Sequence, residues 1–342
     1  MEFVNGRNNF AMTVFVPYDC TNNCPFCTTK CLYKNIMSPE DAEKIISKHL
    51  ESAEKSSVIQ DIVFTGGEPM MDLDMLQRFI KLVPSKNVYI NTNLLKENFF
   101  SFVKLVNKMP QIKGINVSRH KESPLNEPKN QVEDWCLEAF EKPIRINVVI
   151  PADKTLNEVS NFIETVLDRW NGMNATVNFR ADYTKMRSEE LHSFTSDIPA
   201  MLIRHYEFVA HSCCDVCDSL KFYDPAHSQY FTYHRGLEES SINLRTKTIV
   251  NDAILMPYVK TTAKGQEPDY GLFYDWNQKT APEFEELIYD GNGKRRRSSK
   301  SAATKTTTKS TTATKSTPAT SKTPTYEPPS RGCGFFSTCG HF

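Results

Sequence analysis

The chain has 342 residues, of which 39% are hydrophobic and 24% are charged, and its formal net charge at pH 7 is zero. This length allows one large domain with a sizeable core, plus an appendage. No apolar run approaches the roughly 18 residues that a membrane span requires, and the first ten residues lack the basic-then-apolar order of a signal peptide. We therefore expect a cytoplasmic protein with no membrane partner.

The zero net charge hides a division between the body and the tail. Residues 294–331 contain ten Lys or Arg and a single acid, Glu327, so this segment carries a charge of +9 and the rest of the chain −9. Its Lys, Ser, Thr, Ala and Pro residues cannot bury enough apolar area to offset the entropy lost on ordering. The composition predicts a disordered linker, which could attract the acidic body or an anionic partner such as nucleic acid.

Predicted strands and helices alternate along the first half of the chain. The expected strands are 9–18, 59–65, 87–91, 113–117, 144–150 and 175–179. The expected helices between them are one that starts at residue 38, then 73–83, 96–108, 131–140 and 156–170. Six strands alternating with five crossover helices predict a parallel sheet with helices outside it, and six such units suit an incomplete TIM-like barrel.

The start of the first helix has a recognisable capping sequence. Ser38 can act as the N-cap, Pro39 suits the first helical position, and Asp41 is placed for a capping box. We therefore expect the helix to begin directly after Ser38.

Three cysteines follow the first predicted strand within one short loop. Cys20, Cys24 and Cys27 have C-x3-C-x2-C spacing, and the aromatic Phe26 lies just before the third. Three thiolates can hold a cubane iron–sulfur cluster and leave its fourth iron open, whereas a closed zinc site needs a fourth protein ligand. Because ligand spacing alone does not identify the metal, a zinc site completed by Cys31 or a distant ligand is the alternative.

A second motif, Thr65-Gly66-Gly67-Glu68-Pro69, ends the second predicted strand. On its own it could be a tight strand-to-helix turn. In a parallel barrel, however, it would share the C-terminal face with the cysteine loop, and active sites collect on that face. The C-x3-C-x2-C and GGEP motifs together resemble those of radical S-adenosylmethionine (radical SAM) enzymes, and the resemblance covers roughly residues 10–180.

The resemblance implies a fold, two cofactors and a first chemical step. Radical SAM enzymes have a (β/α)6 core. The three cysteines would bind a 4Fe-4S cluster, SAM would chelate its open iron, and an electron donor such as flavodoxin or ferredoxin would reduce it. Electron transfer would cleave SAM to methionine and a 5′-deoxyadenosyl radical, which takes a hydrogen atom from the substrate.

The resemblance also suggests which residues contact SAM, although no catalytic residue is evident. Gly66 and Gly67 would let the backbone approach its methionine part, Glu68 would bind its amino group, and Phe26 would pack on adenine. The complete set of expected cofactor-binding residues is Phe26, Gly66, Gly67, Glu68, Pro69, Asn91, Asn93, Ser118 and Arg119. Asn91 and Asn93 are ribose candidates, and Arg119 is a carboxylate candidate. Arg145, Asn147 and Arg180 would line the substrate side if their side chains point inward.

The rest of the chain divides into three expected regions after a core of residues 1–185. Residues 186–293 would form a small extension, with a helix over 188–210 and short strands over 229–276. Residues 294–331 would be the linker, and 332–342 a cysteine-containing terminal peptide. A second iron–sulfur cluster could draw on Cys213, Cys214, Cys217, Cys333 and Cys339, but buried thiols packing as small hydrophobic groups are as good an explanation.

Three functional hypotheses follow. The preferred one is a radical SAM enzyme that modifies a peptide or protein, because the terminal peptide could be a tethered substrate. The second is a radical SAM enzyme that modifies a nucleotide or nucleic acid, with the basic linker as an electrostatic tether. The third belongs to another class: a non-catalytic adaptor that binds zinc or an iron–sulfur cluster.

Overall fold

The computed structural model describes a subset of the chain in two long stretches of continuous backbone and several shorter ones. The described residues are 2–3, 10–17, 20–22, 24, 26–27, 37–119, 131–182, 192–211, 219–234, 248–249, 252–262, 265–273 and 284–289. The chain divides into residues 1–291 with 337–342 and residues 292–336, and every described residue belongs to the first unit.

The six strands between residues 10 and 180 are separated from one another by helical segments. The strands are β1 Glu2–Phe3, β2 Phe10–Val16, β3 Ile59–Gly66, β4 Asn87–Thr92, β5 Ile112–Ser118, β6 Ile144–Val149, β7 Ala175–Arg180, β8 Glu207–His211, β9 Ser219–Asp224, β10 Gln229–His234, β11 Thr248–Ile249, β12 Asp252–Thr262 and β13 Gly265–Phe273. The helices are α1 Pro39–Lys55, α2 Leu73–Lys81, α3 Phe99–Lys108, α4 Leu156–Arg169, α6 Ile198–His205 and α7 Phe284–Tyr289. The described residues also form short 3₁₀ helices at Pro69–Met71 and Asp134–Ala139 and a π-helical turn at Ser193–Asp197.

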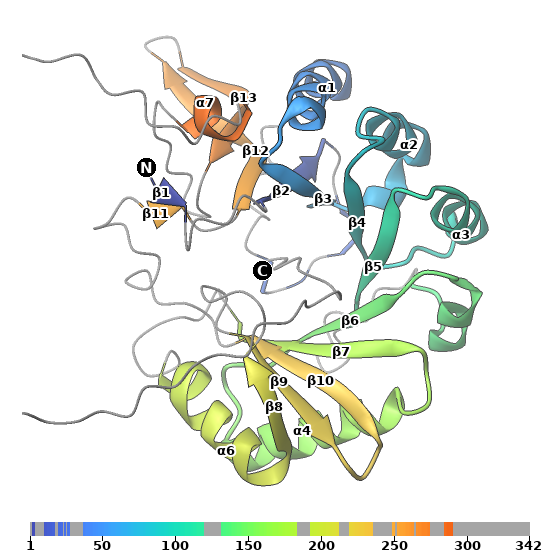
Figure 1. Ribbon diagram of the computed structural model, residues 1–342, viewed down its shortest axis with the longest axis vertical. Helices are drawn as coiled ribbons and strands as arrows, with labels where there is room; N and C mark the ends of the chain where they lie inside the picture. The colour runs from blue at the N-terminus through green and yellow to red at the C-terminus, as the bar shows by residue number, and fades with distance from the viewer. Residues whose placement is uncertain are drawn as a thin grey trace, which may run out of the picture. The chain divides into compact units, whose positions relative to one another are not determined.

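An 11-stranded sheet with the order β13-β12-β2-β3-β4-β5-β6-β7-β10-β9-β8 organises these elements. Strands β2 to β7 are neighbours in chain order and all pair in parallel. Figure 1 shows them following one another around an arc, with α1, α2 and α3 on its outer side. This order confirms the predicted parallel arrangement of six strands, and it brings all six C-terminal strand ends to one edge of the sheet.

Local sequence signals explain where the helices begin. The Ser38 side chain accepts a hydrogen bond from the Asp41 backbone N–H (3.2 Å), so α1 starts at Pro39 as predicted. Thr155 and Glu158 form a reciprocal capping box at the start of α4. The buried positions of α1 recur every three or four residues, at Ala42, Ile46, Leu50 and Ala53. Helix α1 therefore presents one apolar stripe to the sheet.

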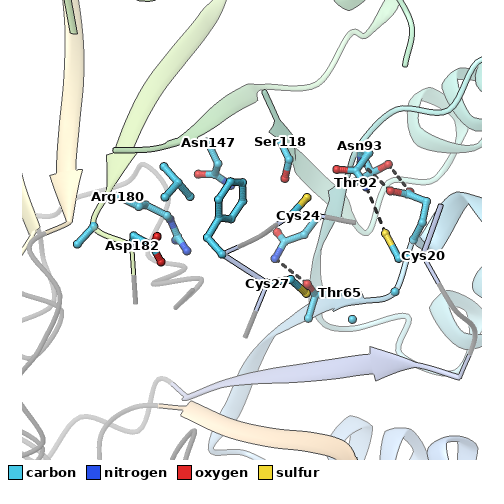
Figure 2. Close-up of a pocket in the computed structure, with 17 residues that line it drawn as sticks. Cys20, Cys24, Cys27, Thr65, Thr92, Asn93, Ser118, Asn147, Arg180 and Asp182 are labelled. Atoms are coloured by element: carbon cyan, nitrogen blue, oxygen red, sulfur yellow. Dashed lines mark hydrogen bonds between the residues drawn. The ribbon is translucent and has the colours of Figure 1, made fainter. Parts of the chain in front are cut away.

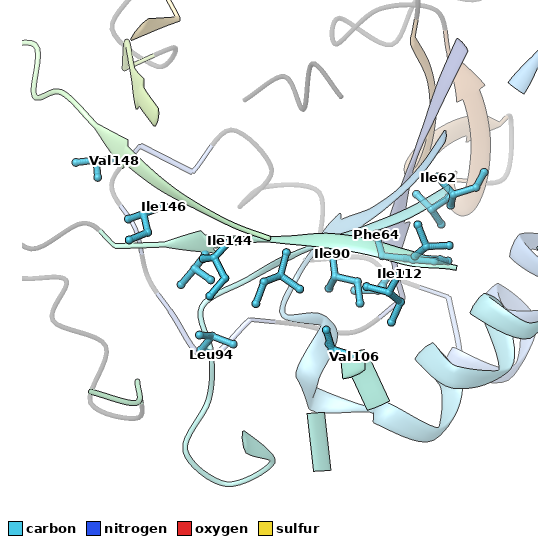
Figure 3. Close-up of a cluster of buried hydrophobic side chains, with 14 of the residues drawn as sticks. Ile62, Phe64, Ile90, Leu94, Val106, Ile112, Ile144, Ile146 and Val148 are labelled. Carbon is cyan, nitrogen blue, oxygen red and sulfur yellow. The ribbon is translucent and has the colours of Figure 1, made fainter. Parts of the chain in front are cut away.

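The hydrophobic core lies between the sheet and these helices. Alternate residues of the strands face it, among them Ile62 and Phe64 of β3, Ile90 of β4 and Ile146 of β6 (Figure 3). The Phe64 ring stacks on Phe79 of α2 with centroids 6.2 Å apart. Because side chains alternate across a strand, the residues between these core positions lie on the opposite, inner face of the sheet. Many of those residues are polar, and they make the site described below.

Two helix predictions need correction. The segment 131–140 is not an α-helix but forms a short 3₁₀ helix, Asp134–Ala139, packed beside α3: the Asn107 side chain of α3 donates to the Ala139 carbonyl. The predicted helix over 188–210 ends at His205, and Glu207–His211 forms β8 instead. Antiparallel pairing of β8 with β9 explains the second difference, because tertiary pairing overrides local propensity.

The region after residue 186 extends the sheet at both edges. Strand β10 pairs in parallel with β7, and β12 pairs in parallel with β2. Strands β12 and β13, of 11 and 9 residues, pair with each other in antiparallel orientation. Both are longer than the short strands expected over 229–276. Within the described residues the sheet remains open between β13 and β8, so the observed fold is a mixed α/β fold with a large sheet.

Helix α7 returns the chain to the start of the sheet. The Ser56 hydroxyl, at the C-terminal end of α1, donates a hydrogen bond to the Ile288 carbonyl, and His49 Nδ1 of α1 lies 2.6 Å from the Tyr289 hydroxyl.

In the part of the chain that the structure describes, no helix has the length and apolar character needed to cross a membrane. The predicted linker 294–331, the terminal peptide 332–342 and the five candidate auxiliary cysteines lie outside the described residues.

Candidate cofactor site at the C-terminal edge of the sheet

A cavity opens at the edge where β2 to β7 end (Figure 2). Its volume of about 140 Å³ is roughly ten times what one enclosed water molecule requires. Each of the six parallel strands contributes lining residues from its C-terminal end or the loop that follows. The lining residues are Cys20, Cys24, Phe26, Cys27, Thr65, Gly66, Gly67, Glu68, Asn91, Thr92, Asn93, Ser118, Asn147, Val149, Arg180, Ala181 and Asp182.

The three cysteines of the loop after β2 all line this cavity. The Cys27 backbone N–H donates to the Cys24 carbonyl (3.2 Å), which closes a turn between the second and third thiols. The Cys20 sulfur accepts hydrogen bonds from the Asn22 backbone N–H (3.4 Å) and from the Asn93 side-chain amide (3.6 Å). Three soft ligands with N–H donors directed at one of them match the donor set of an iron–sulfur cluster.

The electrostatics around Cys20 also fit a bound cationic group. Burial, with smaller effects from the charges of Glu68, Cys24 and Cys27, raises the pKa of the Cys20 thiol to about 12, although the hydrogen bond from the Asn22 N–H opposes this increase. The thiolate form at neutral pH therefore needs positive charge beside it, which iron would supply.

The described residues contain no group of three or more His, Cys, Asp or Glu side chains arranged to hold a single metal ion. A cubane cluster makes a different demand, because each of its cysteine ligands binds a different iron. The thiols must then surround a volume instead of meeting at one point.

The turn after β3 brings backbone to the cavity wall. Gly66 has φ = 112°, in the region that residues with a Cβ rarely adopt, so this position requires glycine. Gly66, Gly67 and Glu68 line the cavity, whereas Pro69, also expected to contact the cofactor, is buried and begins a 3₁₀ turn beyond the lining residues. The turn thus exposes peptide backbone beside the cysteine loop.

The Glu68 carboxylate is fully buried and links this turn to the end of β4. It accepts hydrogen bonds from the Thr92 hydroxyl (2.5 Å), the Asn93 backbone N–H (2.7 Å) and the Met70 backbone N–H (3.0 Å). Burial raises the pKa of Glu68 above its ordinary value, and these three donors, together with the Asn93 side chain, oppose the increase. Glu68 therefore holds the ends of β3 and β4 together, in addition to forming part of the wall.

Arg119 is predicted to contact the cofactor, but the structure places it behind the wall. Its guanidinium donates to the carbonyls of Asn93 (2.9 Å) and Val132 (3.1 Å) and to the Asp134 carboxylate (3.1 Å), and Arg119 is only 4% exposed. The alternation of β5 explains this position: Ser118 points into the cavity, so the next side chain points away from it.

Polar side chains on the inner face form two cross-strand ladders. In the first, the Asn91 amide donates to the Thr65 hydroxyl (3.2 Å) and the Asn116 amide donates to the Asn91 carbonyl oxygen (2.6 Å). The second uses Asn147, Asn178 and Thr232: the Asn178 amide donates to Asn147 (2.7 Å), and the Thr232 hydroxyl donates to Asn178 (2.6 Å). These bonds fix the amide orientations of Asn91 and Asn147 at the cavity.

The ends of β6 and β7 make the wall farthest from Cys20 (Figure 2). Arg180 and Asp182 line it and are 3% and 8% exposed, while Arg145 lies lower on the inner face of β6. Burial, and then the charge of Arg180, lower the pKa of Arg145 to about 10. Two arginines and an acid therefore lie on the side of the site away from the cluster loop.

Most of the sequence-predicted site residues meet in this cavity. The structure brings together Cys20, Cys24, Phe26, Cys27, Gly66, Gly67, Glu68, Asn91, Asn93 and Ser118, along with Asn147 and Arg180 from the expected substrate side. Val149, Ala181 and Asp182 also line the cavity, but they were not predicted to do so from the sequence. Their positions at the ends of predicted strands could have identified them, since every parallel strand contributes residues at this edge.

The first part of the chain is similar to a known protein family. Residues 4–121 match the family described as 4Fe-4S single cluster domain, and this segment contains both motifs. Among solved structures, similarity is found to anSMEcpe with bound AdoMet, both as the native protein and as a histidine-tagged form. Each is 14% identical with a TM-score of 0.39, covering 57% of this chain and 60% of that chain. The chain therefore spans about three fifths of the length of these structures. No curated protein matches it.

Proposed function

We propose that this chain is a radical SAM enzyme whose 4Fe-4S cluster is bound by Cys20, Cys24 and Cys27. One observation carries the proposal: the cysteine loop after β2 and the Gly66-Gly67-Glu68 turn after β3 line one cavity. The match of residues 4–121 to a 4Fe-4S single cluster domain supports it. We take β2 to β7 and the helices between them as the six βα units of an incomplete barrel.

We assign the contacts with SAM to one side of the cavity and the contacts with the substrate to the other. When bound, the cluster and SAM would supply reductive cleavage of SAM and a 5′-deoxyadenosyl radical that removes a hydrogen atom from the substrate. Gly66 and Gly67 expose backbone for the methionine part of SAM, while Phe26, Asn91 and Ser118 offer ring and polar contacts for its nucleoside part. Across the cavity, Arg180 and Asp182 line the side that we assign to the substrate (Figure 2).

The test is anaerobic reconstitution of the full chain with iron and sulfide. We expect about four iron and four sulfide per chain for one cluster, and 5′-deoxyadenosine when SAM and a low-potential reductant such as dithionite, or reduced flavodoxin or ferredoxin, are added. Cys24→Ser should lose both. Cys136→Ser is the matched control, because Cys136 is a partly buried cysteine on the Asp134–Ala139 turn, away from the cavity lining.

The same sample distinguishes the enzyme from a metal-binding adaptor. A colourless protein with stoichiometric zinc would favour the adaptor hypothesis. A reconstituted, reduced protein that carries the cluster but leaves SAM intact would refute the catalytic proposal.

For the substrate we propose a peptide or protein. The proposal is supported by the terminal segment 332–342, which contains Cys333 and Cys339 at the end of a basic stretch and is itself a candidate substrate. Mass spectrometry of the C-terminal peptide before and after turnover tests that candidate. An unchanged mass in samples that form 5′-deoxyadenosine would exclude it, and the assay then extends to added peptides.

A nucleotide or nucleic acid is the second substrate class, and the charge of +9 over residues 294–331 favours it. This alternative predicts salt-dependent RNA binding that weakens when residues 294–331 are deleted. RNA affinity unchanged by the deletion would remove the support for this alternative.

A further inference from the structure

Asn93 occupies a position between the end of β4 and the first cysteine of the loop. Its side-chain Nδ2 lies 3.6 Å from Cys20 Sγ, within the range of an N–H···S hydrogen bond, and Figure 2 shows this contact as a dashed line. Asn93 is 9% exposed, so little water competes for the donor. Asn93 donates from just after the end of β4, whereas Asn22 donates to Cys20 through its backbone from within the loop.

The Asn93 backbone is held on both sides. Its N–H donates to the buried Glu68 carboxylate (2.7 Å), and its carbonyl accepts from Arg119 (2.9 Å). Arg119 is itself held by Asp134 (3.1 Å), which also pairs with Arg169. A network that begins at the buried Glu68 and ends at the partly exposed Arg169 of α4 therefore holds the Asn93 backbone in place, and a side-chain hydrogen bond to Glu68 helps to direct its amide.

We propose that Asn93 raises the reduction potential of the cluster by donating a hydrogen bond to the Cys20 sulfur, and that Glu68 and Arg119 act as the positioning residues that direct it. The inference rests on the cluster of the proposed function. Reduction adds one electron to the cluster and so increases the negative charge on its cysteine sulfurs. An N–H directed at a sulfur stabilises that added charge more than it stabilises the oxidised state. The result is easier one-electron reduction.

This role is compatible with the ribose contact expected from the sequence. A side-chain amide has two N–H groups and one oxygen, and the bond to Cys20 uses one N–H. The Asn93 side chain also hydrogen-bonds the Glu68 carboxylate, and its amide oxygen can still contact a ligand in the cavity, because Asn93 is one of the lining residues. A potential measured without SAM therefore isolates the effect on the cluster.

The test is a redox titration of the reconstituted full chain in the absence of SAM, in which EPR measures the amount of reduced cluster at each potential. Asn93→Ala should lower the ratio of reduced to oxidised cluster at a fixed potential by about two- to tenfold, the range of one hydrogen bond. A tenfold change for one electron corresponds to about 59 mV. Arg119→Lys should shift the potential in the same direction, because lysine cannot bond the same set of carbonyls.

Asn98→Ala is the matched control. Asn98 follows Asn93 closely, is partly buried, and donates its amide to the Met70 carbonyl (2.7 Å), so the variant also removes an internal amide donor but none directed at sulfur. Its potential should equal that of the wild type. Equal potentials for Asn93→Ala and wild type would overturn the proposal, and an unchanged potential in Arg119→Lys would overturn the positioning role of Arg119.

A measurement on the wild type keeps the proposal testable if Asn93→Ala does not load a cluster. With asparagine labelled by ¹⁵N at the side-chain amide, pulsed EPR of the reduced cluster should detect a ¹⁵N coupling transmitted through the hydrogen bond. Absence of that coupling would refute the bond to Cys20. Absence of any iron–sulfur cluster would instead refute the proposed function, so the two failures are distinguishable.

Discussion

Replacing Arg119 by methionine removes a buried guanidinium while keeping an unbranched side chain of similar length. The wild-type guanidinium donates to two buried carbonyls, those of Asn93 and Val132, and to the Asp134 carboxylate. In Arg119→Met both carbonyls lose a charged donor, at about 1–3 kcal/mol each. Asp134 keeps its pairing with Arg169, and relief of the desolvated cation offsets part of the loss. We expect the free energy of unfolding to fall by about 2–4 kcal/mol.

Arg78→Met is the matched control for this prediction. Arg78 pairs with Glu43 (2.6 Å) on the surface, where its side chain is 53% exposed, so its loss should cost no more than about 1 kcal/mol. The assay is urea unfolding of the cofactor-free full chain in reducing buffer at pH 7, followed by circular dichroism and compared through the midpoint at equal slope. Equal midpoints for Arg119→Met and Arg78→Met would refute the view that Arg119 is a buried structural anchor.

Three further predictions address the backbone, a titrating pair and a helix cap. Because Gly66 (φ 112°) and Gly172 (φ 79°) both have positive φ, alanine at either position should cost about 1–2 kcal/mol of stability in thermal unfolding. Only Gly66→Ala should also reduce SAM cleavage. Equal cleavage by both variants would contradict a role for the Gly66 backbone. The hydrogen bond to Asp224 raises the pKa of His227 above 6.5, so its stabilising effect should be complete below pH 6.5 and disappear as the pH rises through the folded-state pKa. Asp224→Asn should weaken this dependence in urea unfolding from about pH 5.5 to about pH 8.5, because only the smaller effects of Asp168 and Glu164 then remain. An unchanged profile would contradict the role of the Asp224–His227 pair. Thr155→Ala should lower stability by about 1 kcal/mol by removing the N-cap of α4, and a loss below about 0.3 kcal/mol in urea unfolding would show that the cap contributes little.

The linear sequence was sufficient to predict the six parallel strands and the edge where the site forms. Short-range patterns carry this information: strands have buried β-branched and aromatic runs, helix starts have caps such as Ser38, and the cysteine and glycine motifs are contiguous. The C-terminal ends of neighbouring parallel strands lie at one edge of the sheet, and both motifs directly follow predicted strands. Their positions in the sequence therefore predict that Cys20 and Glu68 lie close together, and both line the same cavity.

Only the tertiary structure decided which partners distant residues meet. β12 pairs with β2, and β10 pairs with β7, although the strands of each pair are far apart in the chain. The local sequence of these strands does not predict which strand each one pairs with. Likewise, the position of Arg119 at a strand end indicated the correct edge, but its direction depended on the register that turns Ser118 inward. Asn93 reaches Cys20, and Arg119 reaches Asn93, because side-chain direction and strand register together determine such contacts, and register is a property of the assembled sheet.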